Sequence, residues 1–175
     1  MKACAPYKIR LIVLTHGHYD HTENAAALSE HLGAPIAMHA DDAGLIESFT
    51  NQPLQAKGAL GKMILSVSRL EASRRKASAF TPSVFLKDGD DLSGYGVPAR
   101  VVGLPGHTRG SIGIDVGGKD LIVGDALMNM LFPAVSPLRH DEAAALESAQ
   151  KIASLGERTV YFDHGRPSRN RKWVK

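Results

Sequence analysis

Four side chains with metal-binding chemistry lie close together near the start of this 175-residue chain, in the stretch Thr15-His-Gly-His-Tyr-Asp-His21. His16 and His18 are two residues apart, so in an extended loop both imidazoles can point to the same side and bind one ion. Asp20 and His21 follow where the chain is expected to turn into a helix, so these two side chains can face a neighbouring point. The spacing therefore predicts two adjacent groups of ligands.

Three single histidine or aspartate residues follow later, each just beyond a short β-like run. They are His107 after the run at 99–104, Asp125 after the run at 121–123, and His164 after the run at 159–162. Loops at strand ends can hold such residues at one edge of a rigid sheet. Cys4 is the only cysteine, so a thiolate zinc site is excluded and any metal must be bound by histidine and carboxylate.

The segments between these residues alternate between patterns typical of strands and of helices. Apolar runs at 9–14 and 35–38 flank a helical pattern at 23–32, and this strand–helix–strand unit predicts parallel pairing. Apolar residues at helical spacing predict an amphipathic helix over residues 60–70. The remaining elements are expected as short strands at 84–86, 99–104, 112–116, 121–123 and 159–162, a hairpin at Gly117-Gly118, and a helix at 141–155.

Composition and charge narrow the class of protein. Hydrophobic residues make up 43% of the chain, enough for one core, so a single domain over residues 1–175 is expected. No apolar run approaches the ~18 residues of a membrane span, and the single cysteine favours a cytoplasmic location. The net charge of +3 is uneven, because segment 50–83 carries six basic residues against one acid and residues 166–175 form a basic tail. Such a tail is usually solvated, so nucleic-acid binding is not favoured.

In their residues and their order along the chain, these motifs resemble those of the metallo-β-lactamase-fold hydrolases, specifically the glyoxalase II-like branch. The resemblance covers about residues 9–167 and rests on the 15–21 stretch, Pro105-Gly-His-Thr-Arg-Gly-Ser111, Gly124-Asp-Ala126 and His164-Gly165. It implies a mixed α/β (α+β) fold, a four-layer αβ/βα sandwich with two metals at one edge. It also implies the ligand sets: His16, His18 and His107 for the first metal, Asp20, His21 and His164 for the second, and Asp125 bridging both.

The ligand set and the resemblance together predict a dinuclear metal-dependent hydrolase. Two divalent ions, zinc first and iron or manganese as alternatives, can trap a bridging hydroxide and act as Lewis acids, so no serine or cysteine nucleophile is needed. Asp20 is placed to orient that hydroxide and to take its proton. The predicted substrate is a small ester, thioester, lactone or phosphodiester. An anionic one is weakly favoured by the basic segment 50–83, which is expected to form a lid-like helical insertion over the site.

Two other functions stay open at this point. A mononuclear iron enzyme similar to the persulfide dioxygenases would use His16, His18 and Asp125 without a second metal. A non-catalytic metal-binding interaction module would keep the ligands without turnover. Within the resemblance, Asp125 argues against a true β-lactamase, which lacks this bridging carboxylate. Because few residues follow His164, we expect the helical domain with which glyoxalase II holds glutathione to be absent.

The short segment before the first motif leads to a prediction about assembly. Only fifteen residues precede His16, whereas the relatives implied by the resemblance carry several dozen more, so the first half of the sandwich is expected to be N-terminally truncated. An uncovered strand edge and apolar face invite pairing with another chain. We therefore expect a homo-oligomer, most simply a twofold dimer. The alternative is that the chain is a fragment of a longer protein.

Overall fold

Three short parallel strands form the first sheet of the structure, a computed structural model that describes residues 4, 6–74 and 80–174. The strands lie in the order β1-β2-β4, with bounds β1 Ile12–Val13, β2 Ile36–Met38 and β4 Val84–Phe85. Ile12 pairs with Ile36 in a parallel ladder, which confirms the predicted strand–helix–strand unit. β1 is shorter than the predicted 9–14 because it lies at the sheet edge and pairs only with the three-residue strand β2.

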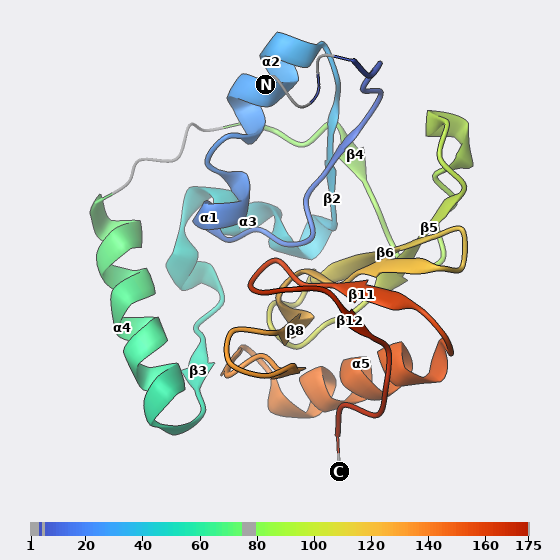
Figure 1. Cartoon of the computed structure of the whole chain (residues 1–175). Coiled ribbons are helices and arrows are strands. Elements are labelled where there is room, and N and C mark those ends of the chain that lie inside the picture. Colours follow the sequence, from blue (N-terminus) through green and yellow to red (C-terminus); the bar gives the residue numbers. More distant parts are fainter. Residues whose placement is uncertain (1–3, 5, 75–79, 175) are drawn as a thin grey trace.

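Three short helices, labelled α1, α2 and α3 in Figure 1, lie beside this sheet. Their bounds are α1 Tyr19–Thr22, α2 Ala25–Leu32 and α3 Ala43–Glu47. The helix predicted over 23–32 is α2, which begins two residues later than predicted, and a separate one-turn helix, α1, precedes it inside the motif. Asp20 and His21 lie on α1, where the chain was expected to turn into a helix, and α2 ends at Gly33 as predicted.

Five strands form the second sheet, in the order β12-β11-β7-β6-β5. Their bounds are β5 Ala99–Gly103, β6 Ile112–Val116, β7 Asp120–Ile122, β11 Thr159–Tyr161 and β12 Ser168–Arg169. β6 and β7 are antiparallel and joined through the predicted Gly117-Gly118 hairpin. β5 and β7 are each antiparallel to β6, and β7 is parallel to β11. The carboxyl ends of β5, β7 and β11 therefore meet at one edge of the sheet.

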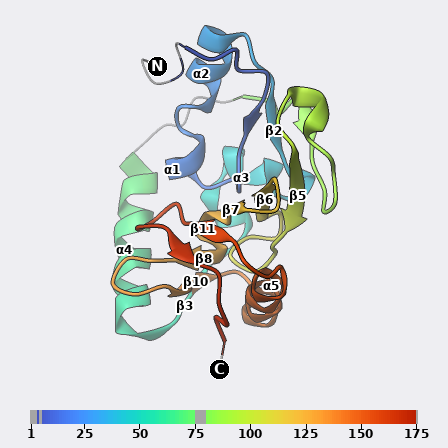
Figure 2. The same ribbon diagram turned by 45° about the vertical axis from the view of Figure 1, so that its right-hand side comes forward.

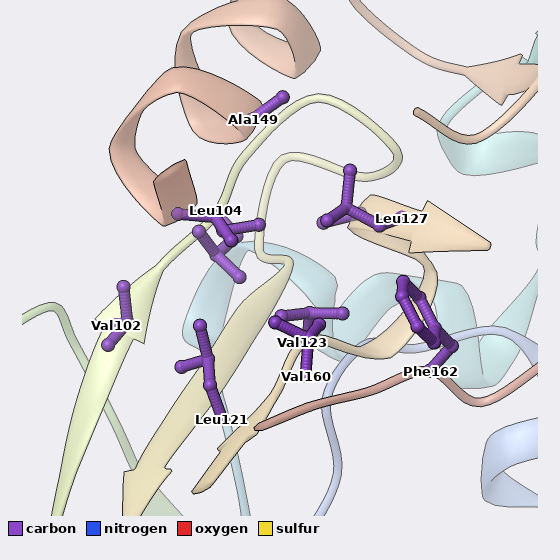
Figure 3. Close-up of a cluster of buried hydrophobic side chains, with 10 residues drawn as sticks. Val102, Leu104, Leu121, Val123, Leu127, Ala149, Val160 and Phe162 are labelled. Carbon is purple, nitrogen blue, oxygen red and sulfur yellow. The ribbon is translucent and has the colours of Figure 1, made fainter. Parts of the chain in front are cut away.

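Apolar side chains fill the space between the layers. One cluster joins the two sheets, with Ala37 of β2 packed among Val101, Ile112 and Ile114 of β5 and β6. Figure 3 shows a second cluster, in which Ala149 of helix α5 (Glu142–Ser154) lies near the side chains of the second sheet. Asp141 caps α5 by accepting a hydrogen bond from the Ala144 amide at 3.1 Å. The helix–sheet–sheet–helix order confirms the predicted four-layer αβ/βα sandwich.

Segment 50–83 contains a longer helix than predicted, α4 at Gly58–Arg74, while residues 75–79 lie outside the described part of the chain. Leu65 of α4 packs with Leu54 and Leu138 in a small apolar cluster. Figure 2 shows α4 beside two paired strands, β3 (Gln55–Ala56) and β10 (Leu138–Arg139). A further pair is formed by β8 (Leu127–Met128) and β9 (Ala134–Val135). The contacts of α4 with β3 and β10 hold this helix at the edge where the strands of the second sheet end.

The basic segment 166–175 contributes to the fold through β12. Val160 of β11 pairs with Ser168 in an antiparallel ladder. Near the end of this basic segment, the Trp173 ring packs edge-on against Phe162 with ring centroids 6.0 Å apart. This apolar contact attaches the segment to the core. Among the described residues, no helix has the length and apolar character that a membrane span requires.

Candidate metal centre

The loop that leaves β1 carries two deeply buried histidines, His16 and His18, with 1% and 5% of their surface exposed. The Ile112 amide donates to the Thr15 carbonyl at 2.8 Å, which ties this loop to the second sheet just before the motif. The Thr15 hydroxyl lies 3.2 Å from Nδ1 of His16. The loop therefore leaves Nε2 of His16 directed away from its hydrogen-bonded side.

The loops that follow β5, β7 and β11 bring His107, Asp125 and His164 to the same place. Nε2 of His107 lies 3.0 Å from Nδ1 of His18 and 3.6 Å from Oδ2 of Asp125. Oδ2 of Asp125 lies 3.5 Å from Nε2 of His164. Asp125 therefore stands between the histidines of the first loop and the histidine after β11.

All seven residues that the sequence marked as ligands are brought together. Their ligand atoms form three overlapping groups, each within 4.8 Å: His16, His18 and His107; His16, His21 and Asp125; and Asp20, His21 and His164. Four of the seven are almost fully buried, whereas the side chains of Asp20 and His164 are 41% and 39% exposed. One side of the cluster is therefore closed by protein and the other is open.

Several ligand atoms in this cluster have no hydrogen-bond partner among the described residues. These buried atoms are Nε2 of His16, His18 and His21, and Oδ1 of Asp125. Burying a polar atom without a partner costs about 1–3 kcal/mol, so four such atoms in one place call for a bound group. Imidazole nitrogens and carboxylate oxygens suit a divalent metal. The residues present therefore fit the metals that the motif predicts.

Neighbouring groups fix the orientation of two of these histidines. Nδ1 of His21 lies 3.1 Å from Oδ2 of Asp163, and this same oxygen accepts a hydrogen bond from the Thr15 hydroxyl at 3.1 Å. Nδ1 of His107 lies 2.8 Å from the Leu138 carbonyl oxygen. Partners of this kind set the tautomer and leave Nε2 directed at the site, which is how metal-binding histidines are usually supported.

Burial and neighbouring charges shift the pKa values of the cluster in two directions. Burial, followed by the nearby imidazoles, lowers the pKa of both His16 and His18 well below the ordinary value. Burial also lowers the pKa of His107 to about 4. These three imidazoles are therefore neutral at pH 7, the form in which a nitrogen can bind a metal.

His21 and Asp125 behave differently. Burial alone would lower the pKa of His21, but its hydrogen bond to Asp163 and the charge of Asp125 raise it to about 9. Burial raises the pKa of Asp125 to about 8. The hydrogen bond to Asp163 therefore keeps His21 protonated at pH 7 in the metal-free chain, and a metal would have to displace that proton.

Asp42 is a buried carboxylate that no sequence motif indicated. It is fully buried and accepts hydrogen bonds from the amides of Gly17 (2.9 Å) and Gly110 (2.8 Å) and the hydroxyl of Thr108 (2.6 Å). Gly17 lies between His16 and His18, and Thr108 follows His107. A Cβ atom at Gly17 would lie 2.6 Å from the Asp42 carbonyl oxygen, so only glycine permits this approach. Asp42 therefore connects the two loops that carry the first ligand group.

A cavity of about 110 Å³ adjoins the open side of the cluster. Asp20, His107, Asp125 and His164 form its polar side. Its remaining wall is mostly apolar, and Ile64 and Ser68 of α4 belong to it. A group held in this cavity would lie against the histidine and aspartate cluster, so the cavity is a candidate substrate site.

The fold and the centre define an αβ/βα sandwich protein whose candidate metal ligands lie in the loops after β1, β5, β7 and β11 and on α1. Residues 2–164 match the sequence profile of the metallo-beta-lactamase superfamily, and the chain belongs to this superfamily. The fold of this superfamily binds divalent metals, in agreement with the ligand groups found here.

Two relatives illustrate the similarity in sequence. The chain is 23% identical over 180 residues to the probable metallo-hydrolase YflN of Bacillus subtilis, covering 92% of this chain and 66% of that protein. It is 32% identical over 122 residues to the hydroxyacylglutathione hydrolase GloC of Haemophilus influenzae, covering 68% of this chain and 50% of that protein. The chain thus corresponds to half to two thirds of these relatives.

Solved structures show the same fold. The BLEG-1 B3 metallo-beta-lactamase superposes with a TM-score of 0.72 at 24% identity, over 95% of this chain and 75% of that one. The protein TTHA1623, crystallised in a di-iron-bound form, superposes with a TM-score of 0.68 at 23% identity, over 99% of this chain and 84% of that one. At these identities the likeness establishes the fold.

Proposed function

We propose that this chain is a dinuclear metal-dependent hydrolase that cleaves a small ester, thioester, lactone or phosphodiester. The observation that carries the proposal is the convergence of seven histidine and aspartate side chains, several with unpartnered buried ligand atoms, on one side of a cavity. Membership of the metallo-beta-lactamase superfamily and the names of its metallo-hydrolase and hydroxyacylglutathione hydrolase relatives support a metal-dependent hydrolase.

The distances support two adjacent metal positions. His16, His18 and His107 would hold one ion, and Asp20, His21 and His164 the other. Asp125 would bridge them, because its Oδ2 lies 3.6 Å from Nε2 of His107 and 3.5 Å from Nε2 of His164. When bound, two divalent ions supply an acidified water and Lewis-acid polarisation of the substrate carbonyl or phosphoryl group. Zinc is our first choice, with iron or manganese as alternatives.

Asp20 would act as the proton carrier. Its Oδ2 lies 3.5 Å from Nε2 of His21 and 3.8 Å from Nε2 of His164, and its half-exposed side chain lines the cavity. A carboxylate placed between the ligand cluster and the substrate can accept the proton of the attacking water and pass it to the leaving group. His107 and Asp125 belong to the same polar side of the cavity and are almost fully buried, so the site is closed to solvent behind them.

The remaining parts of the proposal concern covering, assembly and location. Ile64 and Ser68 place α4 at the cavity, which supports a covering role for segment 50–83. A twofold dimer and a cytoplasmic location stay predictions, the second from the single cysteine, Cys4.

A panel of small esters, thioesters, lactones and phosphodiesters tests the proposed function. Hydrolysis should be lost after removal of metal by a chelator and restored by zinc, iron or manganese. His18→Ala should lower both metal content and turnover about a hundredfold, whereas the exposed His31→Ala on α2 is the matched control. Oxygen consumption with a persulfide, without hydrolysis of any member of the panel, would overturn the proposal in favour of an iron oxygenase. Metal binding without either reaction would favour an interaction module.

Asp20→Asn separates the proton role from ligation. Turnover should fall far more than substrate binding, because the amide cannot accept the proton. Unchanged turnover would leave Asp20 no more than a minor ligand.

A further inference from the structure

The wall of the cavity beside the metal centre is built from apolar side chains. They come from both halves of the chain: Phe49, Leu54, Ile64, Met128, Met130 and Leu138. Leu54, Met128 and Leu138 are buried, while Met130 is exposed and marks the outer rim. A group that enters the cavity therefore meets the polar cluster on one side and hydrocarbon on the other.

No lysine or arginine is found among the described residues that line this cavity. Two of the described basic side chains of segment 50–83, Lys57 and Arg69, lie elsewhere. Lys57 forms an ion pair with Glu142. Arg69 lines a neighbouring surface groove, which shares Phe49 and Leu54 with the cavity and also contains Glu47. A negative charge at the inner wall of the cavity would thus find no described cationic side chain beside it.

We infer that the cavity accepts a short, uncharged, apolar acyl group, so that the substrate is a neutral carboxylic ester, thioester or lactone. The inference rests on the proposed function, because it assumes that the acyl carbon is presented to the metal centre. This inference differs from the expectation of an anionic substrate drawn from the sequence. That expectation rested on the number of basic residues in segment 50–83 and not on the positions of their side chains.

The size of the cavity limits the acyl group. Its volume of about 110 Å³ is smaller than the ~150 Å³ apolar cavity that encloses a benzene ring. Such a space holds roughly four or five heavy atoms, so a butyryl group fills it and the leaving group extends past Met130 towards solvent. A terminal carboxylate on the acyl chain would lose its hydration against Leu54 and Leu138 without gaining a partner.

Two esters that differ only at the end of the acyl chain provide the test. In 4-nitrophenyl butyrate that end is a methyl group, and in 4-nitrophenyl succinate it is a carboxylate. With the metal-loaded enzyme, kcat/KM for the butyrate should exceed that for the succinate by about tenfold or more. Equal values, or a preference for the succinate, would overturn the inference while leaving metal-dependent hydrolysis in place.

A pair of variants on one helix tests the cavity itself. Ser68 lines the cavity on α4, whereas Ser66 is exposed on the same helix and does not line it. Ser68→Arg should place a cation at the cavity and narrow the butyrate preference by about tenfold, and Ser66→Arg should leave it unchanged. The same preference in both variants would show that the acyl group binds elsewhere.

A binding measurement tests the apolar cavity independently of catalysis. If no ester is hydrolysed, the proposed function fails, but the binding measurement still tests this inference. Methyl-labelled, metal-free protein is titrated with 2-pentanone and with levulinate, which differ by the same exchange of a methyl group for a carboxylate. The methyl resonances of Leu54, Ile64 and Met128 should shift with 2-pentanone and not with levulinate. Stronger shifts with levulinate, or none with either compound, would overturn the inference.

Discussion

The carboxylate of Asp163 lies 3.1 Å from Nδ1 of His21, although 142 residues separate them along the chain (163−21). Burial would raise the pKa of Asp163, but the hydrogen bond to His21 and the charge of that imidazole lower it below its ordinary value. Asp163 therefore stays ionised and fixes the imidazole with Nε2 directed at Asp20 and Asp125. This contact sets the second ligand group in place before any metal binds.

Asp163→Ala should weaken binding of the second metal by about 10–100-fold, because His21 loses the partner that orients it. Competition with a metal-sensitive dye measures the two affinities separately. Asp120→Ala is the control, since Asp120 bonds the exposed Tyr161 hydroxyl instead. Equal affinities in the two variants would show that the His21 contact does not support the site.

Asp42→Asn should lower the free energy of unfolding by about 3 kcal/mol, because the amide NH₂ replaces one carboxylate oxygen and would face the backbone N–H of Gly17 or Gly110 that now donates to it. Urea unfolding of the metal-free chain measures the change. The adjacent Asp41 is exposed, so Asp41→Asn should change stability by less than about 0.5 kcal/mol. If Asp42→Asn unfolds at the wild-type urea concentration, the carboxylate does not hold the two ligand loops.

Metal uptake should release protons. The metal-free chain keeps His21 protonated below about pH 9, and a metal-bound imidazole nitrogen cannot carry that proton. Zinc binding at pH 7 should therefore release about one proton from His21, and the apparent affinity should rise as the pH increases towards 9. Calorimetry in two buffers with different ionisation heats counts the protons, and His21→Ala should abolish most of the release. Zinc uptake without proton release would contradict a protonated His21.

The predicted dimer has a candidate surface beside β1. A groove of about 680 Å³ is lined by Leu11 and Val13 near the first sheet's edge and by Val97 and Ile122, which are exposed. If a second copy covers this groove, light scattering should give a mass close to twice that of one chain. Val97→Glu should then shift the protein to monomer, whereas Val67→Glu on the exposed face of α4 should not. A wild-type monomer at micromolar concentration would contradict the prediction.

The residues of the candidate metal centre could be predicted from sequence because each lies in or beside a local sequence pattern. His16, His18 and Asp20 share one short motif, and His107 follows an apolar run that becomes β5. A short apolar run indicates a buried strand, and the residue just after that run lies at the end of the strand, so a few neighbouring positions are enough to predict both. The fold followed from the same signals, and the larger strands and helices lie within a few residues of their predicted bounds.

The supporting residues could not be predicted, since their partners are distant in sequence. Asp42 differs from Asp41 only in which way its side chain points, and its bonds reach Thr108 and Gly110 across the fold. The apolar lining of the cavity could not be predicted for the same reason, because Phe49 and Met128 line one cavity only after the two halves of the chain pack together. The basic composition of segment 50–83 gave no information about which of its side chains would face the metal centre.

The most direct measurement of the central claim is a zinc titration of metal-free protein in which bound zinc and ester hydrolysis are followed together. We predict that about two equivalents bind per chain and that hydrolysis reaches its maximum only when both positions are filled. Hydrolysis that is complete at one equivalent would contradict a dinuclear mechanism. Full activity in the chelated protein would contradict metal-dependent hydrolysis altogether.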